Sequence, residues 1–209
     1  IVDANLLKIM PNLKFIICPT TGLDHISLDL MEKNNILLLS LKGEKNFINK
    51  INATPEHTFA LILCLIRNII PSYNEVLKGN WSQSEFRGTE LFKKTIGIVG
   101  MGRVGKKIAN FSTAFGMRVL YFDPYVNIKP YEKVYLLEDL AKKSDVVSIH
   151  IPLNNENVNI INKDFFSKMK KNSIFINTSR ADVIDNLELV NHLKNNKIYA
   201  AALDVVEKD

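Results

Sequence analysis

Three glycines in the segment GIVGMGRVG have the spacing of a dinucleotide-binding loop. Gly100, Gly102 and Gly105 follow the pattern G-x-G-x-x-G, which by itself also occurs in ordinary glycine-rich turns. Here an apolar stretch at 95–100 leads into the loop, and a stretch with helical spacing at 103–115 leads out of it. In that setting the glycines permit a tight turn, close approach of backbone amides to a pyrophosphate, and close packing of helix on strand. The segment therefore predicts a dinucleotide site at a helix N-terminus.

An aspartate at the end of the next apolar stretch favours NAD as the dinucleotide. Asp123 closes the stretch 118–123, about 20 residues beyond the first glycine, where such folds place an acid. Its carboxylate can accept hydrogen bonds from the hydroxyls of the adenine ribose, and it would repel the additional phosphate of NADP. The alternative is a turn residue before Pro124, but the complete strand–loop–helix–strand pattern favours the ribose ligand.

A further group with chemistry to offer is Arg180, which comes directly after the apolar stretch 173–179. Ligands of open α/β sheets bind at the carboxyl ends of the parallel strands, and an arginine there can hold a carboxylate through two parallel hydrogen bonds. The alternative is an ordinary exposed loop arginine. Because the glycine loop, Asp123 and His150 are expected at the same edge of the sheet, we interpret Arg180 as an anion-binding residue.

The elements that must position these groups alternate regularly in the second part of the chain. Apolar stretches typical of buried parallel strands occur at 95–100, 118–123, 146–152, 173–179 and 198–205. Helical spacing occurs between them at 103–115, 137–143, 163–170 and 186–195. This alternation predicts an α/β fold with a doubly wound parallel sheet.

The first part of the chain has a shorter alternation. Strands are expected at 14–19 and 36–40, with a helix at 28–34 between them. A turn-rich link then ends near Gly88, where the strand–helix series begins. We therefore place a domain boundary there, which gives domains of 1–88 and 89–209.

A strongly apolar helix precedes that boundary. It is expected to begin at Pro55 with Thr54 as its cap and to end at Pro71. Its most apolar part, FALILCLI, is too short to span a bilayer. We expect His57 and Cys64 to pack inside the protein.

Composition restricts the classes of function. The chain carries a net charge of +5, but its basic residues are spread along the sequence instead of forming the concentrated patch of a nucleic-acid surface. Cys18 and Cys64 lie in apolar runs, so neither a disulfide nor a metal site is expected. No signal peptide is visible, although the chain starts at Ile1 and is expected to be part of a longer protein. We expect a cytoplasmic protein that binds neither nucleic acid nor membrane.

Six segments together resemble the D-isomer-specific 2-hydroxyacid dehydrogenase family, which includes phosphoglycerate and glycerate dehydrogenases. They are TTGLDHI, ATPEHTFALIL, GIVGMGRVG, SDVVSIHIPLN, INTSR and AALDV, in family order and at family spacing. The resemblance implies an NAD-dependent oxidoreductase that interconverts a D-2-hydroxy acid and its 2-keto acid, usually as a homodimer. It also implies a Rossmann cofactor domain and part of a smaller, flavodoxin-like substrate domain. The alternative is a non-catalytic NAD-sensing protein, like the corepressor relatives of the family.

The resemblance assigns roles to the residues that match the motifs of the family. Arg180 matches the arginine that binds the substrate carboxylate and carbonyl, and Asp204 matches the acid that holds the nicotinamide carboxamide. Thr21 and Gly22 match a loop that faces the cofactor and the substrate anion. The other residues expected along the cofactor are Gly100, Gly102, Arg103, Val104, Gly105, Asp123, Ile151, Pro152, Thr178 and Ser179.

The family uses a histidine as catalytic acid and a glutamate as its partner. None of the four histidines matches that acid: His25, His57, His150 and His192. The family histidine follows the LDV segment, so we expect a fragment that stops before it. Family spacing puts the partner carboxylate at Asp209, for which the alternative is a terminal surface charge. The particular 2-hydroxy acid and the role of the segment 42–52 are not specified by the sequence.

Overall fold

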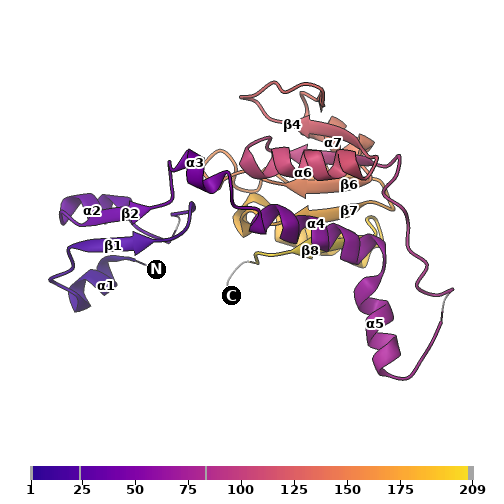
Figure 1. The fold of residues 1–209 in the computed structure, drawn as a ribbon, viewed down its shortest axis with the longest axis horizontal. Helices are drawn as coiled ribbons and strands as arrows, with labels where there is room; N and C mark the ends of the chain where they lie inside the picture. The colour runs from indigo at the N-terminus through magenta and orange to yellow at the C-terminus, as the bar shows by residue number, and fades with distance from the viewer. Residues whose placement is uncertain (1, 24, 83, 207–209) are drawn as a thin grey trace. The chain divides into compact units, whose positions relative to one another are not determined.

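The computed structural model describes residues 2–23, 25–82 and 84–206. The chain forms two compact units that divide between Asn52 and Ala53. We call them the N-terminal unit and the C-terminal unit and describe each by itself (Figure 1).

The N-terminal unit is built around two parallel strands. Strand β1 (Phe15–Cys18) pairs with β2 (Leu37–Ser40). Its helices are α1 (Ala4–Ile9), α2 (Leu28–Lys33) and α3 (Lys45–Ile48). Buried side chains of Cys18, Ile26, Met31 and Ile36 form its core. Both strands and the helix between them were predicted from the sequence.

The C-terminal unit contains a six-stranded sheet whose neighbouring strands all pair in parallel. In sequence order the strands are β3 (Thr95–Val99), β4 (Arg118–Phe122), β5 (Glu132–Lys133), β6 (Val146–Ile149), β7 (Ile174–Asn177) and β8 (Ala200–Leu203). Their order across the sheet is β5-β4-β3-β6-β7-β8, so the direction of winding reverses between β3 and β6. The predicted doubly wound parallel sheet is confirmed. The sequence did not predict β5, because it consists of only two residues, both charged.

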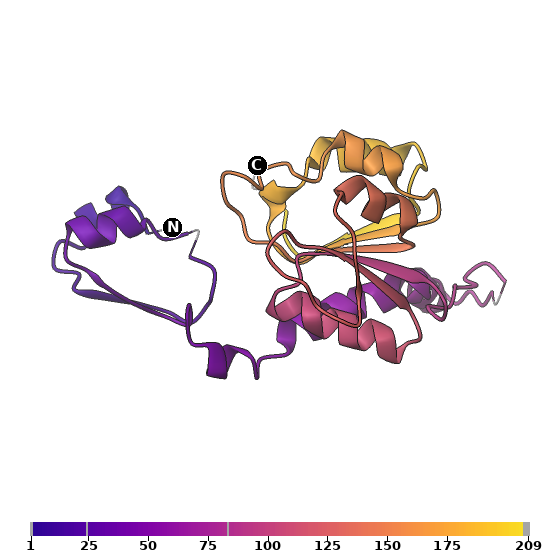
Figure 2. The same ribbon diagram turned by 90° about the horizontal axis from the view of Figure 1, so that it is seen from above.

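Helices cover both faces of this sheet, as Figure 2 shows. The helices α4 (Ala53–Ile66) and α6 (Arg103–Ala114) pack against one face, where Phe59, Ile62 and Ile108 meet inward residues of the strands. On the other face, the strands meet the buried side chains of Leu140, Phe166 and Leu189. These three come from α7 (Leu137–Lys143), α8 (Lys163–Lys168) and α9 (Asn186–Lys194). The strands are buried on both sides, which explains why they are apolar throughout.

The apolar helix before Gly88 differs from its prediction. It begins at Ala53, so Thr54 and Pro55 lie in its first turn and Thr54 is not its cap. It also ends earlier, because Asn68 takes a left-handed conformation with φ of 52° and begins the separate helix α5 (Ile69–Leu77). Pro71 therefore lies in the first turn of α5, where its missing N–H costs no helical hydrogen bond.

The helix α4 contributes to the core of the C-terminal unit through Phe59 and Ile62, while Cys64 is only half-buried. Along the described part of the chain, no single helix is both long and apolar enough to cross a membrane. Within the described residues, one pair of helical segments, Lys45–Ile66 and Ile69–Leu77, is long and apolar enough to cross a membrane when taken together, but it is bent by 65° at its break. The domain boundary expected near Gly88 stays a prediction, because the division of packing at Asn52 need not coincide with a functional boundary.

Leu140 tests the packing of this sheet. Its side chain is fully buried against β3, and a Cβ added at Gly97 would lie 2.5 Å from its Cδ2. We expect Leu140→Ala to lower the free energy of unfolding by about 2–5 kcal/mol, because it leaves a cavity in a closely packed core. Leu187→Ala, at a side chain that is 79% exposed, is the matched control and is expected to change it by less than about 0.5 kcal/mol. Urea titration measures both, and equal losses would contradict the described packing.

Candidate functional site

The glycine loop between β3 and α6 contains two kinds of glycine. Gly100 has φ of 93°, and a Cβ there would lie 2.5 Å from the carbonyl oxygen of His150. A Cβ on Gly105 would lie 2.1 Å from the carbonyl oxygen of Gly100. Packing within the protein therefore requires both glycines. A Cβ on Gly102 would meet nothing within 4 Å, so the space beside Gly102 is open.

That open space adjoins the start of α6. Gly102 caps this helix of 12 residues without a side-chain hydrogen bond, so the cap itself does not compete for the amides of the first turn. The positive end of the helix dipole and these amides make such a terminus favourable for phosphate. Among the described residues no contact explains a glycine at position 102, as is expected where the backbone of such a loop leaves room for a pyrophosphate. Arg103 and Val104, both predicted to contact the cofactor, form the first turn.

Asp123 connects the glycine loop to the end of β4. Its Oδ2 accepts a hydrogen bond from the backbone N–H of Met101 at 2.8 Å. Its Oδ1 accepts from the backbone N–H groups of Tyr125 at 2.9 Å and Val126 at 3.2 Å. The carboxylate therefore holds the loop in place in addition to the ribose-binding role predicted for it. A carboxylate oxygen has a second lone pair, so these bonds leave acceptor capacity for ribose hydroxyls.

The turn after β7 is organised by a buried asparagine that the sequence analysis did not single out. Asn177 accepts hydrogen bonds through its Oδ1 from the N–H and hydroxyl of Ser179, at 2.9 and 2.7 Å. Its Nδ2 donates to the carbonyl oxygen of Arg180 at 2.8 Å. Asn177 is fully buried, so this network fixes the backbone that presents Ser179 and Arg180.

A second buried contact ties this turn to α4. The hydroxyls of Thr58 and Thr178 lie 2.8 Å apart, and the Thr58 hydroxyl also donates to the carbonyl oxygen of Thr54 at 2.7 Å. If Thr58 donates to Thr54, then Thr178 must donate to Thr58, because each hydroxyl has one proton. The position of Thr178 beside β7 is thus set by a residue 120 positions earlier in the chain.

Arg180 lies at the carboxyl end of β7, as predicted. Its guanidinium Nη1 donates to the carbonyl oxygen of Ser179 at 2.8 Å, and the side chain is half-buried. A short 3₁₀ turn (Ala181–Val183) follows directly. The N–H donors of a guanidinium lie in one plane, in a geometry that matches the two oxygens of a carboxylate.

Asp204 follows β8, and its backbone N–H donates to the carbonyl oxygen of Asn177 at 3.0 Å. Its Oδ1 lies 3.3 Å from Nε2 of His57 on α4. The prediction that His57 packs inside the protein is therefore wrong, since its side chain is 50% exposed. The apolar residues around His57 suggested burial, but it lies on the face of α4 that meets Asp204.

His150 comes directly after β6, at the same edge of the sheet. Its Nε2 lies 2.8 Å from the hydroxyl of the buried Ser148. Although part of the residue is exposed, burial lowers the pKa of His150 to about 3. The ring is thus neutral at physiological pH and braces the end of β6. The next residue, Ile151, packs beside Gly100, where an added Cβ would lie 2.8 Å from its Cγ2.

The C-terminal unit thus brings together most of the residues predicted for the site. Gly100, Asp123, His150, Thr178 and Asp204 each follow directly after one of five neighbouring strands, β3, β4, β6, β7 and β8. The carboxyl ends of parallel strands meet at one edge, so these residues share that edge. Pro152 follows in the loop after β6, where its carbonyl oxygen accepts from Nδ2 of Asn157 at 3.0 Å.

Three of the predicted residues are not part of this arrangement. Thr21 and Gly22 lie in the loop after β1 in the N-terminal unit, where the hydroxyl of Thr20 donates to the carbonyl oxygen of Gly22 at 2.9 Å. Asp209 lies outside the described residues. The roles of all three stay predictions.

Comparisons with known proteins identify two family matches along the chain. Residues 59–209 match the family described as "D-isomer specific 2-hydroxyacid dehydrogenase, NAD binding domain". Residues 1–114 match the one described as "D-isomer specific 2-hydroxyacid dehydrogenase, catalytic domain". The two matches overlap over residues 59–114, from within α4 to the end of α6.

Curated proteins and solved structures agree with these matches. Over its whole length the chain is 34% identical to D-3-phosphoglycerate dehydrogenase of Archaeoglobus fulgidus, of which it spans 39%. It is 36% identical over its whole length to glyoxylate reductase of Thermofilum pendens, of which it spans 62%. The structure of D-lactate dehydrogenase from Aquifex aeolicus, complexed with NAD and lactic acid, matches with a TM-score of 0.84 and 36% identity. That match covers 99% of this chain and 62% of the other. The chain thus spans less than two thirds of each of these relatives.

The lowered pKa of His150 predicts a pH-dependent stability. Its pKa is about 3 in the folded protein and about 6.5 when unfolded, so unfolding takes up a proton between these values. The free energy of unfolding should therefore fall as pH falls from 6.5, by at most about 1.4 kcal/mol per pH unit for this group. In urea titrations from pH 7 downward, His150→Gln should lack this component, so the variant should lose less stability than the original protein. If the free energy of unfolding fell equally with pH in the original protein and in His150→Gln, the burial of a neutral imidazole would be contradicted.

Proposed function

The chain belongs to the D-isomer-specific 2-hydroxyacid dehydrogenases, and on that premise we propose that the protein interconverts a D-2-hydroxy acid and its 2-keto acid with NAD. One observation carries the proposal: Arg180 lies at the same edge of one parallel sheet as the open glycine loop and Asp204. That arrangement can hold an anionic substrate next to a dinucleotide. Oxidation of NADH by the complete protein in the presence of a 2-keto acid is the direct test.

Residues along the sheet edge fit the parts of the cofactor in order. Asp123 beyond β4 would accept from the adenine ribose, and the first turn of α6 with Gly102 would hold the pyrophosphate. Thr178, Ser179 and Asp204, beyond β7 and β8, would line the nicotinamide end, with Ile151 and Pro152 along its length. When bound, the nicotinamide supplies or accepts the hydride. The His57 side chain at Oδ1 of Asp204 would leave Oδ2 to accept from the carboxamide.

Arg180 has two tasks on this proposal. Its guanidinium would bind the substrate carboxylate with a bidentate pair of hydrogen bonds, which fixes the face that carbon 2 presents to the nicotinamide. It would also stabilise the negative charge that develops on the carbonyl oxygen during reduction. The buried Asn177 network supports both tasks, because it holds the backbone of Arg180 in place.

The remaining assignments are part of the same proposal. Residues 1–88 would belong to the substrate domain, with Thr21 and Gly22 facing cofactor and substrate, and residues 89–209 would form the cofactor domain. Asp209 would be the carboxylate partner of the catalytic histidine, supported by family spacing from Arg180 and Asp204. A cytoplasmic location is supported by the free thiols of Cys18 and Cys64.

A homodimer is also part of the proposal, and α5 supports it. None of its residues is buried, and Tyr73, Val76 and Leu77 are all more than half exposed. Trp81, in the loop that follows, is 86% exposed. Large apolar side chains that gather on one exposed element are typical of protein interfaces.

The preference for NAD is tested at Asp123. We expect Asp123→Ser to raise the ratio of NADP to NAD use, because it removes the charge that repels the 2′-phosphate. The same change removes an acceptor from Met101 N–H, so overall cofactor affinity should also fall. Asp123→Asn keeps an acceptor but not the charge, and it should raise the ratio with a smaller loss of affinity. An original protein that already prefers NADP in steady-state kinetics would contradict the assignment.

The role of Arg180 is tested by a conservative change. In the complete protein, Arg180→Lys should raise KM for the keto acid and lower kcat together, since a point charge cannot replace a planar fork in both ground and transition states. Arg118→Lys, at an exposed arginine paired with Glu132 at the amino end of β4, is the matched control. Unchanged kinetics in Arg180→Lys would reduce Arg180 to a structural role.

Retained NAD binding without turnover in the original protein would favour a non-catalytic NAD sensor.

The proposed dimer is tested at Trp81. A charge at the centre of an apolar interface is strongly unfavourable, so Trp81→Glu should convert a dimer to a monomer. Light scattering on the eluate of a size-exclusion column measures the mass. Tyr135→Glu, at a side chain that is 78% exposed outside this segment, should leave the dimer intact. Dissociation by both changes, or by neither, would argue against this interface.

A further inference from the structure

A pocket lies at the amino edge of the same sheet, opposite to the edge that carries Gly100 and Arg180. We call it the amino-edge pocket. Lys94 and Asp145 in its lining directly precede β3 and β6, Ile174 begins β7, and Tyr199 directly precedes β8. Its volume is about 520 Å³, which is enough for a small organic molecule. Nothing in the proposed dehydrogenase reaction uses this edge.

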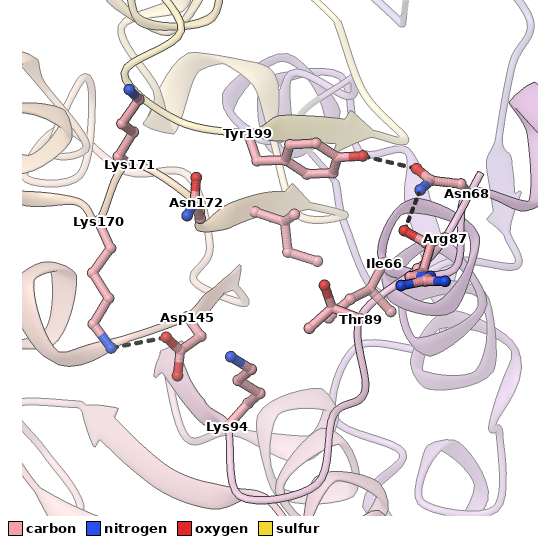
Figure 3. A pocket seen from close by; sticks show the side chains of 12 residues that line it. Ile66, Asn68, Arg87, Thr89, Lys94, Asp145, Lys170, Lys171, Asn172 and Tyr199 are labelled. Carbon is pink, nitrogen blue, oxygen red and sulfur yellow. Dashed lines mark hydrogen bonds and ion pairs between the residues drawn. The ribbon is translucent and has the colours of Figure 1, made fainter. Parts of the chain in front are cut away.

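The wall of the pocket is held in shape by specific contacts. Asn68, in its left-handed conformation, accepts a hydrogen bond from the Tyr199 hydroxyl at 2.8 Å (Figure 3). The chain passes close to the end of α4 at Gly88, where an added Cβ would lie 2.7 Å from the carbonyl oxygen of Ile66. The backbone N–H of Thr89 donates to the same carbonyl at 2.9 Å. These contacts make the pocket a fixed feature of the C-terminal unit.

Asp145, the acidic residue in the lining of this pocket, already has hydrogen-bond and ion-pair partners within the protein. Asp145 accepts a hydrogen bond through Oδ2 from the backbone N–H of Thr95 at 2.8 Å. Its Oδ1 pairs with Nζ of Lys170 at 2.9 Å, as Figure 3 shows. The charges of Asp145 and Lys170 therefore offset each other, and both residues brace the starts of β3 and β6.

Three further cationic side chains line the pocket without an ion pair of the kind that Lys170 makes with Asp145. Arg87, Lys94 and Lys171 have no carboxylate within ion-pair distance among the residues that the structure describes. Figure 3 shows Lys94 extending into the pocket, with Arg87 on another side of it. Lys94 is half-buried in this lining. Like charges around a concave surface raise the local concentration of anions.

The other lining residues complete the chemistry. Thr89 and Asn172 offer hydrogen-bond donors, while Ile66, Ile174 and the ring of Tyr199 add apolar surface. We propose that the amino-edge pocket binds a small organic anion with two negative charges, a phosphate ester or a dicarboxylate, through Lys94 and Arg87. The site is independent of the cofactor site, so the inference stands whether or not the proposed reaction does.

The experiment measures anion binding by calorimetry and thermal unfolding. Inorganic phosphate and malonate are the doubly charged probes, and potassium chloride at equal ionic strength is the reference. We expect saturable binding of a doubly charged probe, with a raised unfolding temperature. A preference for phosphate over malonate would identify the ligand as a phosphate ester, and the reverse a dicarboxylate.

Two variants locate the effect. Lys94→Met keeps most of the side-chain volume, and combined with Arg87→Gln it should weaken binding by at least about tenfold, the scale of one charge-assisted hydrogen bond. Lys142→Met, at an exposed lysine of α7, is the matched control and should bind as the original protein does. Phosphate should also shift the backbone NMR signals of Thr89 and Lys94 in the original protein, a readout that needs no variant.

Three results would overturn the proposal. They are no saturable binding of either probe, equal binding by the double variant, and signal shifts confined to the glycine loop at Gly102. The last of these would place the anion at the start of α6, at the opposite edge of the sheet.

Discussion

The whole site depends on the parallel direction of the six strands. Because β3, β4, β6, β7 and β8 all run the same way, the residue that follows each of them arrives at one edge. Reversing any one strand would carry its functional residue to the amino edge. The change of winding between β3 and β6 then leaves the glycine loop in the centre of that edge, with Asp123 on one side and Arg180 and Asp204 on the other. Side chains of both helical layers, such as Ile62 and Leu140, hold the strands in this arrangement.

Buried polar contacts convert this coarse placement into a defined geometry. Asp123 fixes the glycine loop through Met101, and Asn177 fixes the turn that carries Arg180. Thr58 links that turn to α4. Each of these groups would be costly to leave unpaired, so the same contacts that shape the site also stabilise one conformation of it. Some of these contacts are local, as between Asn177 and Arg180, whereas Thr58 reaches Thr178 from 120 positions away in the chain.

Motif and periodicity were sufficient to predict the parallel sheet, the glycine loop and the placement of Arg180. They succeed there because an apolar run followed by a polar residue specifies both a strand and the edge where it ends. They failed for His57, since helical periodicity alone does not reveal which neighbour a polar residue of α4 will meet. They also missed the break at Asn68 and the two-residue strand β5. The conformation of Asn68 is held by a hydrogen bond from the distant Tyr199 hydroxyl, which local sequence does not reveal, and the two charged residues of β5 carry no apolar pattern.

The central claim is that the open space at Gly102 is shaped for the pyrophosphate of NAD, and Gly102→Val tests it most directly. The added Cβ meets no described residue within 4 Å, so we expect the free energy of unfolding to change by no more than about 1 kcal/mol, the cost of a poorer helix cap. NADH binding, followed by calorimetry in parallel with urea unfolding, should be lost in the variant. A variant that binds NADH as the original protein does would contradict the account.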